Sequence, residues 1–268
     1  METIDEQIDD FKTVKLEDAK AFYQKFYGAS HGELAVVGDF DAAPVKKAVE
    51  ELFGNWKSQA PYERIKTGFQ KVAPVNQSIE TPDKANAVFA GGERLNLSDQ
   101  DPDYGALVFG NYMLGGGFLN SRLATRIRVK DGLSYGVGSN LSAKSDEKDG
   151  QFGVFAIAAP QNIAKVETAF KEELDRALKD GFTQKEIDAD RTGWLQSRQV
   201  TRSEDRSLAQ TLTSRDYDNR TLAWDETLEN KVKNLTADEI VAAMRRNVDP
   251  AQITIIKAGD FQKAAGGK

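Results

Sequence analysis

A chain of 268 residues with a formal charge of −6 is long enough for one large or two modest domains. The absence of cysteine excludes disulfides, thiolate chemistry and cysteine metal sites, and a single histidine, His31, excludes a zinc site built on a histidine pair. The acidic balance argues weakly against a nucleic-acid surface, and no apolar run approaches the roughly 20 residues that cross a bilayer.

The first 57 residues predict a helix, a short strand and a second helix. Residues 16–27 carry apolar side chains at helical spacing. Glu33 to Val37 is an apolar stretch typical of a strand, and a Gly-Asp-Phe triplet follows it. Asp41 is the expected N-cap of the second helix, which ends at Gly54. His31 lies in the turn before the strand, where we expect it in solvent without a partner.

The middle of the chain predicts a linker, a strand and a helix. Residues 58–75 contain two prolines and show no clear period, which is typical of a linker. Residues 85–95 predict a strand with a kink at its two glycines. Residues 98–102 resemble a helix start, and apolar spacing continues this helix to about residue 113.

The stretch from Leu114 to Asn140 contains glycine, arginine and tyrosine residues, a combination that predicts a binding surface. Three glycines lead to a short basic helix, a Lys-Asp-Gly turn and a strand that places Leu133, Tyr135 and Val137 on one face. Glycine inside an element costs about 1 kcal/mol relative to alanine, so three in succession indicate a sharp bend or a close approach. Two interpretations stay open for them: a tight turn between helices, or a loop that lets a peptide approach the backbone.

The remaining sequence alternates between strand and helix patterns. Capping boxes at Thr183/Glu186 and Thr236/Glu239 mark two helix starts. The expected elements are a strand over residues 151–159 that pairs antiparallel with the preceding one, helices over 163–178, 184–216 and 237–247, and a last strand over 252–258.

The end of the chain repeats its beginning. Sliding the sequence against itself by 221 positions places Gly38-Asp39-Phe40 on Gly259-Asp260-Phe261 without a gap. We therefore predict that residues 1–57 are the terminal helix-strand-helix piece of a preceding repeat, that residues 58–75 are a linker, and that residues 76–268 are a complete carboxy-terminal repeat domain. The chain is expected to be a fragment of something longer.

The string LGGGFLNSRL, followed by an arginine and a GLSY tyrosine seven positions apart, resembles the carboxy-terminal, non-catalytic region of pitrilysin/insulinase-type zinc peptidases. The resemblance covers nearly the whole chain and is closest to the bacterial long-chain type. It implies an α+β fold of repeated domains, each an antiparallel sheet with helices packed on one face (the LuxS/MPP-like metallohydrolase fold). It also implies that zinc and the H-x-x-E-H motif of these inverzincins lie in an amino-terminal half that this sequence does not contain.

The same resemblance implies that Arg128 and Tyr135 reach toward a peptide near its scissile bond. Their donors would support the negative charge that develops on the carbonyl oxygen, in trans to the metal. From the pattern alone, the alternative is a surface arginine in an ion pair and a core tyrosine. The predicted substrate-binding residues are Arg128, Tyr135, Gly115, Gly116 and Gly117, and no catalytic residue or metal ligand is expected in this chain. Arg122 and Arg126 are expected to support the helix surface.

We therefore expect the substrate-binding half of a zinc metalloendopeptidase, inactive alone, that closes a chamber with a metal-bearing half of the same polypeptide or of a partner subunit. The alternative is an inactive homologue acting as a scaffold or assembly subunit. A nucleotide-binding protein is disfavoured because no Gly-Lys-Ser/Thr follows a strand. No nucleic-acid partner and no membrane span are expected. Residues 2–10 do not resemble a signal peptide, and family analogy gives a periplasmic location, with a cytoplasmic one left open.

Overall fold

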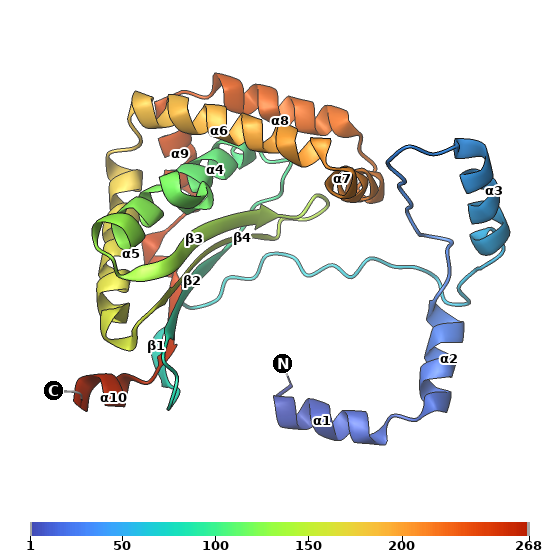
Figure 1. The fold of residues 1–268 in the computed structure, drawn as a ribbon, viewed down its shortest axis with the longest axis horizontal. Helices are drawn as coiled ribbons and strands as arrows, with labels where there is room; N and C mark the ends of the chain where they lie inside the picture. Colours follow the sequence, from blue (N-terminus) through green and yellow to red (C-terminus); the bar gives the residue numbers. More distant parts are fainter. Residues whose placement is uncertain (1, 267–268) are drawn as a thin grey trace. The chain divides into compact units, whose positions relative to one another are not determined.

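The structure is a computed structural model that describes residues 2–266, and it divides into two compact units. One unit combines the residues up to Ile65 with the helix α7 (Asp205–Tyr217). The other combines residues Lys66–Glu204 with the residues from Asp218 onward. Figure 1 shows the elements of both. We call them the amino-terminal unit and the sheet unit, and we describe each by itself.

The sheet unit is built on five strands in the spatial order β1-β5-β2-β4-β3. Strands β2 to β5 pair antiparallel, whereas β1 runs parallel to β5. The predicted α+β fold with an antiparallel sheet is confirmed, and the parallel pairing of β1 with β5 is the departure from that pattern among the described strands. Parallel pairing requires a long connection, and nearly the whole unit lies between β1 and β5 in sequence. The bounds are β1 (Asn76–Glu80), β2 (Ala87–Leu95), β3 (Ser134–Ala143), β4 (Gly150–Ala158) and β5 (Thr254–Gly259).

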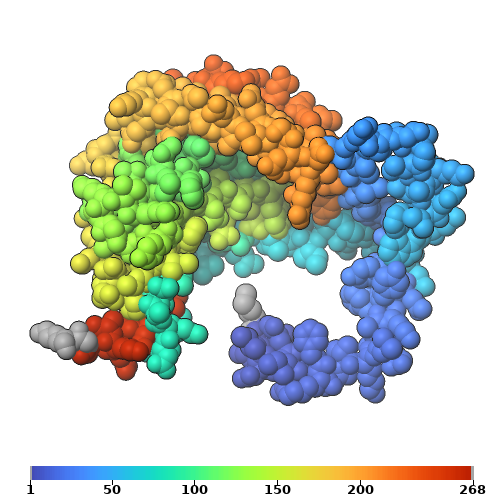
Figure 2. Space-filling view, in the orientation of Figure 1, coloured from blue at the N-terminus to red at the C-terminus, as the bar shows by residue number. Residues whose placement is uncertain are grey.

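Helices cover one face of this sheet (Figure 1). Helix α4 (Tyr104–Asn111) contacts β3, and α5 (Ile163–Lys179) contacts β2 and β4. Helix α9 (Ala237–Asn247) packs against both α4 and α5. The helices α6 (Gln184–Ser203) and α8 (Leu222–Asn234) form a continuous outer layer, which Figure 2 shows in yellow-orange and orange.

Short helices connect these elements. Two are π-helical, namely η1 (Tyr112–Gly116) and η3 (Ala124–Lys130), and three are 3-10 helices, namely η2 (Phe118–Asn120), η4 (Pro160–Asn162) and η5 (Pro250–Gln252). Helix α10 (Phe261–Gly266) follows β5.

The core lies between the sheet and the helices. Phe89 and Phe152 point into it from the sheet, and Phe170, Leu174 and Leu107 meet them from the helices, each at most 2% exposed. Burying a side chain of this size stabilises the fold by about 1.5–3 kcal/mol. This core therefore holds the sheet and α4 in place, and with them the start of the glycine-rich stretch that follows α4.

Two helix boundaries differ from their predictions. Helix α4 was expected to start near Ser98 but begins at Tyr104. Asp101 accepts hydrogen bonds from the backbone N–H and the hydroxyl of Ser98, and these bonds hold a turn before the helix. The predicted helix over residues 184–216 is wrong, since α6 ends at Ser203. Glu204 is extended, and α7 begins after it. The capping boxes at Thr183 and Thr236 are confirmed.

The amino-terminal unit contains α1 (Ile4–Thr13), α2 (Leu16–Phe26) and α3 (Ala42–Phe53) together with α7. The predicted strand at Glu33–Val37 is wrong, because this stretch is irregular and its Leu34 is 62% exposed. A strand needs a neighbour to satisfy its N–H and C=O groups, and none lies in the described part of this unit. No described residue of the unit is buried.

Candidate functional site

The three glycines let the π-helical turn η1 lie directly on β3. A Cβ atom on Gly115 would lie 2.4 Å from Oγ of Ser139 and 2.7 Å from the backbone nitrogen of the same residue. A Cβ on Gly117 would lie 2.9 Å from the carbonyl oxygen of Tyr112. The structure thus supports the tight-turn interpretation for Gly115, which is buried, and for Gly117. Gly116 is exposed, so a peptide contact at its backbone stays a prediction.

Arg122 fastens the segment after the glycines to α6. Its Nε donates to Oε1 of Glu186 at 2.8 Å, and its Nη2 donates to Oε2 of Glu186 at 3.0 Å and to the carbonyl oxygen of Gly181 at 2.7 Å. The guanidinium also lies over the ring of Phe182, 4.3 Å from its centroid. With a side chain only 9% exposed, Arg122 is a buried anchor and not a residue of the helix surface.

Arg126 and Gly132 shape the turn between η3 and β3. The Nε of Arg126 donates to Asp131 at 2.6 Å, and its Nη2 donates to Glu172 at 3.1 Å. Gly132 has φ of +62°, which a side chain would disfavour, and the N–H of Leu133 closes the turn on the carbonyl oxygen of Ile127 at 2.8 Å. The path from η3 into β3 is therefore held at several points.

Tyr135 is the extra residue of a β-bulge. Ser134 lies opposite Ala158 and Gly136 lies opposite Ile157, so Tyr135 has no partner across the strands. The hydroxyl of Ser134 donates to the carbonyl oxygen of Ile157 at 2.6 Å and accepts the N–H of Gly136 at 3.1 Å. Bulges re-aim a side chain, and Tyr135 is 89% exposed.

The bulge changes one prediction about the strand. Leu133 and Val137 pack against the core, whereas Tyr135 does not, so the expected common face for the three residues is wrong. The alternative of a core tyrosine with an ion-paired surface arginine also fails, because Tyr135 is exposed and Arg128 makes no ion pair within residues 2–266.

Arg128 and Tyr135 therefore offer polar groups to solvent from two neighbouring elements. Arg128 lies on η3, which packs against β3, and it is exposed. Neither side chain makes a hydrogen bond with another described residue. The guanidinium provides a fork of N–H donors and the phenol one O–H, a set that suits peptide carbonyl oxygens.

The part of the chain that the structure describes offers no site for a metal ion. No group of three or more His, Cys, Asp or Glu side chains is placed there to ligate one. Nor is any helix within residues 2–266 long and apolar enough to cross a membrane. The side chains exposed at η3 and β3 supply hydrogen-bond donors and positive charge.

Two carboxylates of α6 have pKa values that move in opposite directions. The hydrogen bonds from Arg122 lower the pKa of Glu186 to about 2. Burial, and then the charge of Glu186, raise the pKa of Asp190 to about 6. When the pKa of a carboxyl group is higher in the folded state than in the unfolded state, the folded protein loses stability as the pH rises between the two values.

Replacing Asp190 with asparagine is therefore expected to stabilise the fold at pH 7.5 by about 1 kcal/mol, a value discounted because the side chain is partly exposed. At pH 4 the gain should be far smaller, because Asp190 is protonated in the folded protein and close to half protonated in the unfolded one. Urea unfolding at both pH values measures the difference. Asp175→Asn, an exposed change on α5, is the control, and an equal gain at both pH values would contradict the prediction.

Comparison with known proteins gives one consistent result. The family described as "Peptidase M16 inactive domain" matches residues 13–193. The "uncharacterized zinc protease SCO5738" of Streptomyces coelicolor is 26% identical over 250 residues, which cover 89% of this chain and 52% of that protein. The "non-peptidase homolog YmxG" of Helicobacter pylori is 24% identical, over 93% of this chain and 57% of its own length. The chain thus spans about half the length of these curated relatives.

A solved structure agrees at the level of the fold. The peptidase M16 inactive domain from Pseudomonas fluorescens superposes with a TM-score of 0.76 at 23% identity, over 92% of this chain and 58% of that one. Identity this low supports the architecture, and the roles of individual residues have to be argued from the site itself.

Proposed function

Because the chain belongs to the peptidase M16 inactive-domain family, we propose that it holds a peptide in a chamber that it closes with the metal-bearing half of a zinc metalloendopeptidase. The observation that carries this proposal is the pair Arg128 and Tyr135. Both are exposed, both lack partners within residues 2–266, and a bulge directs one of them away from the core. Their N–H and O–H groups face solvent in the free chain and can exchange water for the carbonyl oxygens of a peptide.

The metal belongs to the other half in this proposal. The single histidine, His31, is exposed and stacks on the ring of Tyr62, with centroids 4.8 Å apart. With no cysteine and one histidine the chain does not fit a zinc site, while one relative is named a zinc protease. Zinc would polarise the peptide carbonyl and activate water there, and this chain would orient the peptide.

The amino-terminal unit is where we expect the metal-bearing half to connect to this chain. Its helices bury no described residue, and Phe22 and Phe26 of α2 remain 57% and 49% exposed. Helices of this length gain most of their stability from packing against other elements. We therefore propose that residues 1–57 complete a preceding repeat, either of the same polypeptide or of a partner subunit. By analogy with the family, we also propose a periplasmic location.

Arg128→Ala and Tyr135→Phe test the proposed function. Loss of one donor that stabilises a developing oxyanion costs on the order of 3 kcal/mol, so we expect peptide cleavage by the chain mixed with its metal-bearing half to fall about 100-fold in each variant. Lys130→Gln, on the same helix, is an exposed control that should cleave normally.

Unchanged cleavage in both site variants would contradict the proposal. The alternative, a scaffold or assembly subunit, is favoured by the similarity to a protein named a non-peptidase homolog. It predicts a stable complex with the partner and no affinity for peptides, so saturable binding of extended peptides would count against it.

A further inference from the structure

The face of the sheet opposite the helices is apolar at one end (Figure 1). Residues that lie opposite one another in neighbouring strands share a face, so Ile79 of β1, Val88 of β2 and Ile157 of β4 fall into one row across the sheet. Phe155 lies in the next row along β4. These four side chains are 44–50% exposed, and we call them the apolar patch.

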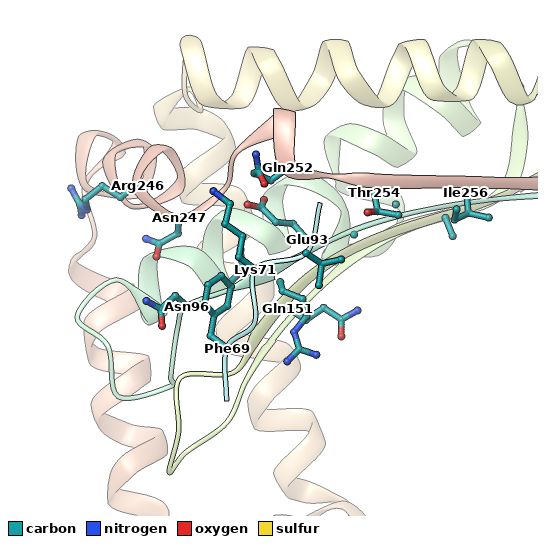
Figure 3. A pocket seen from close by; sticks show the side chains of 16 residues that line it. Phe69, Lys71, Glu93, Asn96, Gln151, Arg246, Asn247, Gln252, Thr254 and Ile256 are labelled. Carbon is teal, nitrogen blue, oxygen red and sulfur yellow. The ribbon is translucent and has the colours of Figure 1, made fainter. Parts of the chain in front are cut away.

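The other end of the same face is polar. The rows there contain Arg94, Gln151 and Thr254. A pocket of about 780 Å³ opens at this end, and Figure 3 shows Gln151 and Thr254 among the side chains that line it. A sheet face in contact with water ordinarily carries polar side chains. The polar end follows this rule and the apolar patch departs from it, which marks the patch as a surface that binds another molecule.

Gly136 borders the apolar patch on β3. It lies opposite Ile157 and directly follows Tyr135, the extra residue of the bulge. The φ of Gly136 is not positive, and a Cβ atom added to it would meet no atom of residues 2–266 within 4 Å. Neither the backbone conformation nor the packing therefore requires glycine here, although glycine weakens a strand. A glycine inside a strand also marks a place where a ligand approaches the backbone closely.

Three side chains surround this open position. A Cβ atom on Gly138 would lie 3.2 Å from Cε1 of Phe155, so the ring of Phe155 extends from β4 over β3. Gly138 lies two residues beyond Gly136 and therefore on the same face. The open position at Gly136 thus has Tyr135 next to it in the chain, Ile157 across from it and the ring of Phe155 beyond it.

We propose that the apolar patch selects which peptides this chain holds: a bulky apolar side chain of the bound peptide lies over Gly136 and packs on Phe155 and Ile157. The two rows of the patch contain no charged residue, so a charged side chain would lose its hydration there without gaining a partner. The position of the patch beside Tyr135 favours a peptide side chain over a second copy of this chain.

This inference rests on the proposed function, in which Tyr135 holds the peptide, and it adds a preference to it. Arg128 and Tyr135 offer donors to carbonyl oxygens, which every peptide carries. They therefore do not distinguish one peptide sequence from another, whereas an apolar surface distinguishes side chains by size and polarity.

The test uses the full chain and two fluorescein-labelled peptides, Gly-Ala-Phe-Ala-Gly-amide and the same peptide with serine in place of phenylalanine. Fluorescence anisotropy measures their affinities. We expect the phenylalanine peptide to bind about tenfold more tightly. Gly136→Val fills the open position and should reduce this preference to about twofold. The free energy of unfolding should stay the same or rise, because valine forms strands better than glycine.

Two further variants make the comparison specific. Ile157→Thr keeps the branched shape of an exposed strand residue and should also reduce the preference, so the test does not depend on Gly136→Val alone. Ser142→Val, at the polar end of the same face of β3, is the matched control and should keep the tenfold preference.

Saturable binding of both peptides with equal affinity would overturn the inference and leave the proposed function standing. A preference that survives in both Gly136→Val and Ile157→Thr would also overturn it. If neither peptide binds, the proposed function fails together with the patch. A dimer in sedimentation equilibrium that Phe155→Ser dissociates would show that a second copy covers the patch, which would again overturn the inference.

Discussion

Arg122→Met is expected to lower the free energy of unfolding by about 2 kcal/mol, the usual contribution of hydrogen bonds between charged groups, because the Arg122 side chain is 9% exposed and that of Glu186 is 33% exposed. The change removes both hydrogen bonds to Glu186 and leaves the carbonyl oxygen of Gly181 without its donor. Methionine keeps most of the volume over Phe182, so the loss is electrostatic and not a cavity. Urea unfolding followed by circular dichroism measures it.

Arg126→Met is the matched control for this change. Arg126 also pairs with two carboxylates, Asp131 and Glu172, but its side chain is 31% exposed against 9% for Arg122. Ion pairs in such positions contribute about 0.2–1 kcal/mol. If Arg126→Met destabilises the chain as much as Arg122→Met, the anchor assigned to Arg122 is wrong.

Gly115→Ala is expected to cost about 3 kcal/mol, at the upper end of the usual range for overpacking. The new Cβ would meet a backbone atom of Ser139 at 2.7 Å and a side-chain carbon of Leu123 at 2.9 Å. A backbone atom of β3 cannot move aside without disturbing the strand. Thermal unfolding should therefore show a clear fall in midpoint.

Gly116→Ala tests whether the effect is specific to that contact. Its Cβ would meet first the side-chain nitrogen of Asn111 at 3.0 Å, an atom that can rotate away, and Gly116 is exposed. We expect less than about 1 kcal/mol from this change. Equal destabilisation by the two substitutions would mean that the glycines act through backbone flexibility and not through the approach of η1 to β3.

Much of the fold could be predicted because it depends on local patterns. The capping boxes at Thr183 and Thr236 lie where the sequence places them, and the apolar spacing of α5 is the face that it buries. The elements that differed from their predictions depend on residues that lie far away in the sequence. β1 has no buried residue and so no alternation to detect, and Glu33–Val37 has the composition of a strand but no strand beside it.

The site was predictable in its residues and less so in its geometry. The seven-residue spacing of Arg128 and Tyr135 is visible in the sequence, but a regular alternation would have buried Tyr135 beside Val137. The bulge depends on how Ser134 bonds across to Ile157, which no single-strand pattern encodes. Arg122 has no such signal, because its partners Glu186 and Gly181 lie about 60 residues away in the sequence.

The bulge at Tyr135 also affects the association of this chain with other copies of itself. Strand β3 is one of the two outer strands of the described sheet, and outer strands are where a further strand from another molecule can add. A bulge breaks the regular spacing that such growth requires, and it does so at the first residues of β3. The same irregularity that exposes the tyrosine therefore protects this edge of the sheet against aggregation.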